Sequence, residues 1–404
     1  MSTAKANSKK MLKLTILVIA MFQMPTQAIS PAIARIVAQF GQELVVVQTA
    51  LQIPNLVSPF ASIIATIILN RSNGRVSKKA AILFGLSCIV VAATGMVLYS
   101  NAFWTLYLWG ALVGVGIGTF IPSTFSLIMD CFDDEERRSI TGLQTSFINI
   151  GGIIMSVLGG ILADVVWYGG YLTFYLGLPI IAMCAIFLPG RKNAADAVVP
   201  EKAATGEKSK FNWNVAFYGV IIFFFMMMSV VSGSNISVYV IDQLGLGTAG
   251  TVGIITAVQM FGGVVSGFAF RKTSARCKDY TVALAFMLLF IGFGLLGLAR
   301  SLPLIFLGAF IAGGAMSWCV PQCIFSISLY VDEKSSTFAS TIASSIAPSL
   351  GGFLSPRVFT TLTTALFGVS ISSRYLFMSG LTLFCCLLLF VIMTVRKKKG
   401  FRGW

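Results

Sequence analysis

The chain has 404 residues, of which 56% are hydrophobic and only 11% are charged, and its mean hydropathy is +0.88. A soluble domain of this size could not cover so much apolar surface with so few charges, so lipid is the expected solvent. The net charge of +15 lies in short Lys and Arg clusters between long uncharged stretches, which argues against a nucleic-acid partner.

Uncharged stretches long enough to cross a bilayer recur along the whole chain. The first follows a basic N-terminal tip, and we interpret it as an uncleaved helix because many more spans follow. A run at 80–129 is too long for one span and is divided at Ser100 and Asn101. The twelve predicted helices lie at 14–34, at 44–69, twice within 80–129, in two stretches ending before 164 and near 189, and at 211–241, 246–270, 280–299, 302–330, within 335–366 and at 375–395.

One part of the chain occurs twice. Residues 110–160 return as 308–352, so that Pro122 corresponds to Pro321. Each copy contains a glycine-rich apolar span, a short acidic loop and a second apolar span. Duplicated units of this kind are typical of many secondary transporters.

The polar segment 190–210 separates the two copies and is interpreted as a flexible cytoplasmic linker. The sequence therefore predicts an all-α membrane protein with twelve transmembrane helices in two pseudo-symmetric six-helix halves, 1–189 and 211–404. With both termini in the cytoplasm, most of the 29 Lys and Arg residues lie inside, which predicts a multi-pass protein of the plasma (inner) membrane. Those that fall outside are Arg35, Arg300 and Arg374.

Two residue types limit the chemistry. The chain contains no His, and its eight Cys are scattered singly apart from Cys385 and Cys386. Neither a metal site nor a disulfide framework is therefore expected. Because the sequence also has no glycine-rich phosphate loop, we expect no cofactor and no enzymatic activity.

Two loops carry a resemblance to a known family. The segment 132–143, FDDEERRSITGL, is similar to the loop between helices 4 and 5 of the major facilitator superfamily. The segment 66–79, TIILNRSNGRVSKK, resembles the signature between helices 2 and 3 of that family, with Asn70 in place of its usual Asp. The six-plus-six repeat resembles the same superfamily over essentially the whole chain. This resemblance implies a secondary transporter that works by alternating access.

The resemblance also implies a cytoplasmic gate, in which basic residues of the helix 2–3 loop meet acids of the helix 4–5 loop. The residues expected to form it are Arg71, Arg75, Lys78, Asp130, Asp133, Asp134 and Glu135. Exposed ion pairs contribute only about 0–1 kcal/mol each, so several must act together. The alternative is that these clusters stay solvated and only set the topology.

The predicted membrane interior holds one charge. All 14 acidic residues map to loops or helix ends, so an obvious proton relay is missing. Arg357, beside Pro356 in the eleventh predicted helix, is the only deep charge in this interpretation. With no intramembrane acid to pair with, its simplest partner is an anionic substrate. The alternative is a structural role in which the side chain extends to the outer headgroups.

Polar residues in the helices that line the central cavity of the family are further candidates. Amides and hydroxyls cost less than charges in lipid and can bind a solute by hydrogen bonds, although each also serves as a helix–helix contact. The substrate-binding candidates are Gln23, Gln27, Gln52, Ser123, Asn149, Asn235, Gln259, Trp318, Gln322 and Arg357.

Two functions remain open at this stage. The first is a monomeric secondary transporter that moves a small organic solute, in particular an organic anion, across the plasma membrane. The second is an exporter of neutral amphipathic compounds or drugs, with an aromatic and Met-rich lining suggested by the run FFFMMM at 223–228. The partners expected in both cases are a small-molecule substrate and the lipid bilayer.

Overall fold

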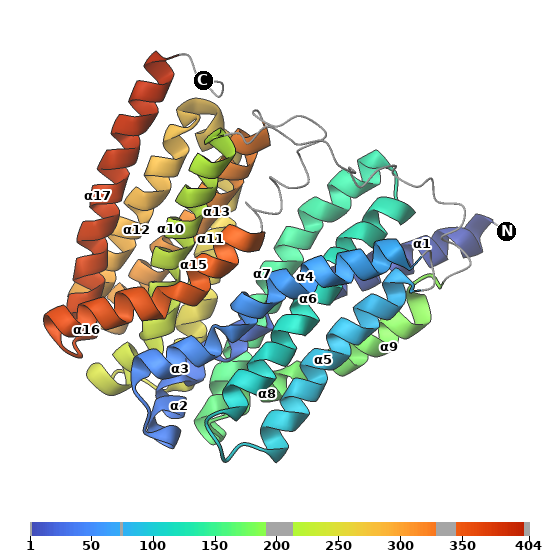
Figure 1. The fold of residues 1–404 in the computed structure, drawn as a ribbon, viewed down its shortest axis with the longest axis horizontal. Helices are drawn as coiled ribbons and strands as arrows, with labels where there is room; N and C mark the ends of the chain where they lie inside the picture. Colours follow the sequence, from blue (N-terminus) through green and yellow to red (C-terminus); the bar gives the residue numbers. More distant parts are fainter. Residues whose placement is uncertain (1, 73–75, 191–212, 329–344, 400–404) are drawn as a thin grey trace. The chain divides into compact units, whose positions relative to one another are not determined.

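The uncharged stretches form long helices. The computed structural model describes residues 2–72, 76–190, 213–328 and 345–399 (Figure 1). Within these residues, ten helices are long and apolar enough to cross a membrane, and a bent pair, Lys9–Met21 and Pro25–Phe40, supplies one further span. The prediction of an all-α membrane protein is confirmed, and twelve helices are compatible with this structure. The linker predicted at 190–210 lies, apart from Gly190, outside the described residues.

One compact unit consists of Met1–Ala32 and Ala50–Glu201. Its helices are α1 (Ser2–Met21), η1 (Pro25–Ala28), η2 (Ser30–Ala32), α4 (Ile53–Arg71), α5 (Lys78–Leu98), α6 (Thr105–Cys131), α7 (Asp134–Val165), α8 (Gly169–Leu172), η3 (Thr173–Leu176) and α9 (Gly177–Phe187). Helix α6 packs against both α4 and α5, and α1 packs against α7 (Figure 1). The break between α5 and α6 lies at Ser100 and Asn101, as the sequence predicts.

The other unit consists of Ile33–Thr49 and Lys202–Trp404. Its helices are α2 (Ile33–Phe40), most of α3 (Leu44–Leu51), α10 (Trp213–Val238), η5 (Tyr239–Gln243), α11 (Ala249–Cys277), α12 (Tyr280–Leu298), α13 (Leu302–Ser328), α15 (Ala347–Ser355), η7 (Pro356–Thr360), α16 (Thr361–Phe367) and α17 (Ile371–Lys398). The short segment from the first half joins this unit by polar contacts. The Ala34 amide, for example, donates to Ser237 Oγ at 3.1 Å.

Aromatic rings form the core of this second unit and fix the start of α17. Tyr375 is fully buried, with its ring 5.3 Å from that of Tyr239 and 5.9 Å from that of Phe293. Its hydroxyl donates to Ser232 O at 3.0 Å. These ring contacts fix the rotation of α17 about its own axis. This rotation also sets the direction in which the preceding residue, Arg374, points.

The sequence repeat corresponds to a structural repeat. Helices α6 and α13 both have 27 residues, and each has its proline, Pro122 or Pro321, within the helix. Gly114 and Gly313 also correspond in this alignment. A Cβ on Gly114 would lie 2.8 Å from Val57 Cβ of α4, and a Cβ on Gly313 only 1.8 Å from the carbonyl oxygen of Gln259 in α11. In both units the glycine therefore allows two helix backbones to approach closely.

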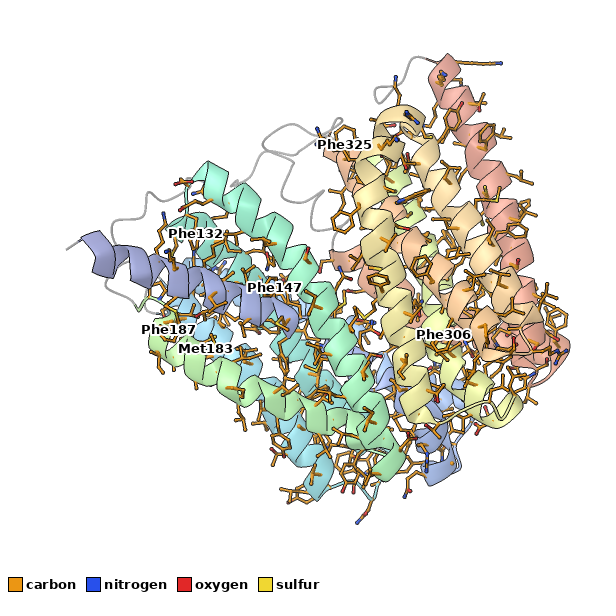
Figure 2. All side chains as sticks on the ribbon, turned by 180° about the vertical axis from the view of Figure 1, so that it is seen from behind. Phe132, Phe147, Met183, Phe187, Phe306 and Phe325 are labelled. Atoms are coloured by element: carbon orange, nitrogen blue, oxygen red, sulfur yellow. The ribbon has the colours of Figure 1, made fainter. Side chains whose placement is uncertain are left out.

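The outer faces of the helices are apolar. Figure 2 shows side chains such as Phe187 and Phe325 pointing away from the helix bundles, and these two are 37% and 54% exposed. Phe268 is 82% exposed. Large apolar side chains in such positions are stable when lipid, rather than water, surrounds the helices.

Candidate functional site

A buried arginine lies in the first turn of α17. Ser370 caps this helix, since its hydroxyl accepts a hydrogen bond from the Ser373 amide, and Arg374 follows with only 1% of its surface exposed. Its Nε donates to Thr363 Oγ1 at 2.8 Å, and one terminal nitrogen donates to Thr364 Oγ1 at 3.0 Å. The other terminal nitrogen donates to Asn235 Oδ1. The helix cap and the hydroxyls of α16 thus hold the guanidinium in one place.

No acidic residue in the described part of the chain is paired with Arg374. Its three hydrogen-bond acceptors in the described part of the chain are two hydroxyls and one amide oxygen, all neutral. A guanidinium has five N–H donors, so two remain for a further acceptor. Taking an ion out of water costs several kcal/mol unless an opposite charge or a strong hydrogen-bond network offsets it. The described part of the chain therefore leaves the cost of burying this charge only partly offset.

Gln48 extends this network into α3. The side chain is 1% exposed, and its Nε2 donates to Ser234 O at 2.7 Å and to Asn235 Oδ1 at 3.1 Å. Its Oε1 accepts from Thr360 Oγ1 at 2.8 Å. We call these polar residues the Arg374 cluster, which comprises the buried Gln48, Asn235, Thr360, Thr363 and Arg374 and the exposed Thr364.

Two arginines of the second unit differ in burial. Arg357 is exposed on η7 and makes no hydrogen bond or ion pair with any described residue, and its depth in the membrane and its role in substrate binding stay predictions. Arg374, expected in an outer loop, is buried. The reason is that α17 begins at Ile371, before the predicted start at 375. A serine followed by an apolar run is a helix-start signal, and Ser370 could have placed Arg374 inside the helix.

The other predicted candidates of this unit bind neighbouring helices. Gln259 Nε2 donates to Ser232 Oγ at 3.0 Å, and Trp318 Nε1 donates to Ser266 O at 2.9 Å. Gln322 is buried in a separate polar cluster. Of the sequence-based candidates, only Asn235 belongs to the Arg374 cluster. Four members of the cluster are not among the predicted substrate-binding residues, because a single polar residue in an apolar helix gives no sign of the direction in which it points. They are Gln48, Thr360, Thr363 and Thr364.

Of the five candidates of the first unit, three lie on separate helices and two lie between helices. Ser123 is fully buried and donates to Thr119 O at 2.7 Å within α6. Gln52 accepts a hydrogen bond from Asn55. Gln23 follows α1 with 9% exposure, and its buried Nε2 has no described partner. The remaining two are half-buried and lie on η1 and α7, namely Gln27 and Asn149. A role of these residues in solute binding stays a prediction.

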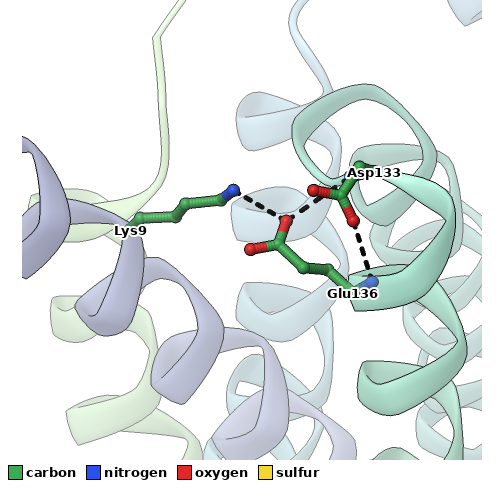
Figure 3. A network of polar contacts seen from close by, with 3 residues as sticks. All are labelled: Lys9, Asp133 and Glu136. Carbon is green, nitrogen blue, oxygen red and sulfur yellow. Dashed lines mark hydrogen bonds and ion pairs between the residues drawn. The ribbon is translucent and has the colours of Figure 1, made fainter.

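The start of α7 carries the predicted gating loop. Asp133 caps the helix, accepting from the Glu136 amide at 2.9 Å, and the Glu136 side chain accepts from the Asp133 amide at 3.4 Å. Lys9 of α1 forms an ion pair with Glu136 at 2.7 Å (Figure 3). The described acid–base pair at this loop therefore joins α1 to α7.

Of the other predicted gating residues, the structure describes the side chains of two, Lys78 and Arg71. Lys78 donates to Ser126 O at 3.2 Å, and Arg71 is exposed at the end of α4. Arg75 and the side chains of Asp130, Asp134 and Glu135 lie outside the described residues. The gating role of this set stays a prediction.

We expect the Asp133→Ala variant to lower the free energy of unfolding by about 1 kcal/mol, because it removes the cap of a long helix. The Lys9→Ala variant should have a much smaller effect, since the ion pair is exposed to solvent on both sides. Thermal melting of the two purified variants in detergent measures the difference. Equal shifts would contradict this expectation, because the ion pair would then stabilise the start of α7 as much as the cap does.

A family model described as Major Facilitator Superfamily matches residues 15–356. The chain belongs to the major facilitator superfamily. It is therefore a multi-pass membrane transporter, and the family predicted from the two loops and the repeat is confirmed. Solved structures similar to this superfamily member are those of transporters as well.

Among curated proteins, the chain is 27% identical over 193 residues to "Multidrug resistance protein 3" of Bacillus subtilis (strain 168). That match covers 46% of this chain and only 35% of the relative, so it spans about a third of the relative's length.

Three solved structures show the same fold at low sequence identity. The nucleoside transporter NupG is 11% identical, with a TM-score of 0.72 and coverage of 96% of this chain and 99% of the other. A tetrameric PepTSo2 is 14% identical with a TM-score of 0.73, over 97% and 99% of the two chains. A bacterial homologue of the human lysosomal transporter Spinster is 16% identical with a TM-score of 0.69, over 96% and 95%.

Proposed function

We propose that this chain is a secondary transporter that moves a small organic anion across the plasma membrane by alternating access. The observation that supports this proposal is the Arg374 cluster, a buried guanidinium whose described partners are all neutral. A transporter of neutral solutes gains nothing from such a charge, and burying it is unfavourable. An anionic solute offsets this cost while it is bound.

The solute that best fits the cluster is a monocarboxylate or another singly charged anion. One guanidinium balances one negative charge, and its two remaining donors can bind both oxygens of a carboxylate. The amides of Asn235 and Gln48 and the nearby threonine hydroxyls can bind further oxygen or nitrogen atoms of the solute. A dianion would need a second cation, and no other Lys or Arg bonds to the described cluster.

The proposed orientation places both termini in the cytoplasm. The basic clusters at the two chain ends and in the loops 70–79 and 271–279 support this topology by the positive-inside rule. The first turn of α17 then lies toward the outer side of the membrane. In this orientation, an arriving or departing solute meets the Arg374 cluster on the outer side.

We further propose that the chain works as a monomer, without a cofactor and without enzymatic activity.

The second candidate is an exporter of neutral amphipathic compounds, which the partial match to a multidrug resistance protein favours. The run at 223–228 gives this candidate less support than the sequence suggested. Phe225, Met227 and Met228 are buried in the core of the second unit, which leaves Phe224 exposed and Phe223 and Met226 half-buried. We therefore prefer the anion transporter.

Uptake into proteoliposomes separates the two functions. A panel of radiolabelled organic monoanions and neutral lipophilic compounds is offered to vesicles with the purified chain and to empty vesicles. We expect protein-dependent uptake of at least one monoanion, and inhibition of this uptake by related carboxylates. Protein-dependent movement of neutral compounds alone would instead support the exporter.

A further inference from the structure

The helical stretch made of α15, η7 and α16 has two kinds of exposed face, of which the first is apolar. Residues four apart lie on one side of a helix. Four apolar side chains with this spacing are 36% to 56% exposed, namely Leu354, Val358, Leu362 and Leu366. An exposed apolar face of this kind is expected to contact the lipid.

The second exposed face of the same stretch is polar. Arg357, Thr361 and Thr364 follow one another at intervals of four and three residues, and all three are exposed. Arg357 and Val358 are neighbours in the chain, so they point in different directions around the helix. A charged side chain that faces hydrocarbon is unfavourable, and such residues in membrane helices turn toward protein or water. Because these three side chains are exposed rather than buried, we expect their face to border water.

The polar face begins at the Arg374 cluster. Thr364 Oγ1 accepts a hydrogen bond from Arg374 at 3.0 Å, so Thr364 belongs to both the cluster and the face. Arg357 precedes Thr364 by seven residues, which corresponds to two turns, or about 10 Å, along a helix axis. In the proposed orientation, Arg357 therefore lies on the cytoplasmic side of the Arg374 cluster.

The backbone is irregular at the same place. Pro356 has no N–H group to continue the hydrogen bonds of an α-helix, and Pro356–Thr360 form the π-helical turn η7. Such turns within α-helices are frequent at functional sites. Arg357 lies within this turn, and its side chain makes no hydrogen bond or ion pair with the described residues. Its charge is therefore available to a ligand.

We propose that the face of Arg357, Thr361 and Thr364 is a water-filled track, and that Arg357 is a second station for the anion bound by the Arg374 cluster. The identity of this ligand, a singly charged organic anion, rests on the proposed function. The two threonine hydroxyls can donate hydrogen bonds to the anion between the guanidinium groups. An anion that leaves Arg374 then exchanges one positive partner for another and does not face hydrocarbon.

Thiol labelling of the full-length chain in proteoliposomes tests the track before any solute is identified. Thr361→Cys is treated, on both sides of the membrane, with methanethiosulfonates that carry either a sulfonate or a trimethylammonium group. Because the chain has eight native cysteines, mass spectrometry of peptides locates the label. Each rate is divided by the rate of the same reagent with free 2-mercaptoethanol.

We expect Thr361→Cys to react, with a preference of about fivefold for the anionic reagent at low salt, because a nearby guanidinium concentrates anions. Leu362→Cys is the matched control on the apolar face and should remain unlabelled. No labelling of Thr361→Cys, equal labelling of Leu362→Cys, or no preference for the anionic reagent would each overturn the track.

Two further substitutions assign the preference to Arg357. When Arg357→Gln is added to Thr361→Cys, most of the preference should disappear, although Arg374 is still present. Arg357→Lys should keep it, since Lys carries the same charge. Arg357 is exposed, so neither change removes a buried contact. A preference that survives Arg357→Gln, or that is lost in Arg357→Lys, would refute the role of this charge.

A transport measurement then tests the second station. For a monoanion that the wild type carries, Arg357→Gln should keep the binding affinity within about threefold, because Arg374 remains, but slow uptake by about tenfold or more. Val358→Ala, the matched control on the apolar face, should transport normally. Unchanged uptake in Arg357→Gln, or a loss of affinity as large as the loss of uptake, would overturn the second station. A wild type that carries no monoanion refutes the proposed function instead and leaves the labelling result intact.

Discussion

The Arg374→Gln variant is expected to lose anion uptake by about 100-fold or more. Removing one member of a buried, hydrogen-bonded charge pair costs about 2–5 kcal/mol, and every 1.4 kcal/mol corresponds to a factor of ten. In this transporter the pair exists only while the anion is bound. Uptake of the monoanion into proteoliposomes measures the loss.

The stability of the same variant distinguishes a binding role from a structural one. Because Arg374 is a buried charge with neutral partners, Gln should leave the melting temperature unchanged or raise it. Arg374→Lys keeps the charge but has three donors on one nitrogen instead of five in a planar fork, so it cannot keep all three protein contacts and also bind both oxygens of a carboxylate. Its uptake should therefore lie between those of the wild type and Arg374→Gln. Arg300→Gln, an exposed arginine between α12 and α13, is the matched control and should transport normally. Parallel loss of uptake and melting temperature in Arg374→Gln would indicate a structural role.

Gly313→Ala is expected to destabilise the second unit strongly. The added Cβ would lie 1.8 Å from the carbonyl oxygen of Gln259, and a backbone atom can move away only if α11 and α13 separate. Overpacking in a close interface costs about 1–3 kcal/mol, and we expect this variant at the upper end. Gly114→Ala should cost less, because its Cβ would lie 2.8 Å from Val57 Cβ and 2.9 Å from the carbonyl oxygen of Pro54, a smaller overlap than at Gly313. Thermal melting in detergent ranks the variants.

Gly267→Ala is the control for the glycine series. It lies in α11, and a Cβ added at this position would have no other atom within 4 Å. The change should therefore be neutral or stabilise by up to about 1 kcal/mol through higher helix propensity. A destabilisation similar to that of Gly313→Ala would contradict the account of close helix packing. The three variants thus compare one substitution in three environments.

The sequence predicted the fold because the fold depends on signals that lie close together in the chain. Uncharged runs located the spans, Ser100 and Asn101 located the break between α5 and α6, and the offset between Pro122 and Pro321 revealed the repeat. Each of these signals needs only the order of residues. Lipid as the solvent makes them strong, since a span must be continuously apolar.

The burial of two charges could not be predicted in the same way. Helix α17 begins at Ile371, before its predicted start, so Arg374 belongs to a helix and not to the predicted outer loop. Asp279 lies between α11 and α12, at a helix end as the sequence predicts, but it is buried. Their burial depends on neighbours that are distant in sequence, such as Asn235 for one and Tyr218 for the other.

The most direct test of the account compares binding of a transported monoanion with binding of its uncharged methyl ester. Affinities are measured by titration calorimetry for the purified wild type and for Arg374→Gln. We expect the wild type to prefer the anion by about 100-fold and the variant to lose this preference, because the charge of Arg374 is its source. Equal binding of the ester by the wild type, or a preference for the anion that persists in Arg374→Gln, would contradict it.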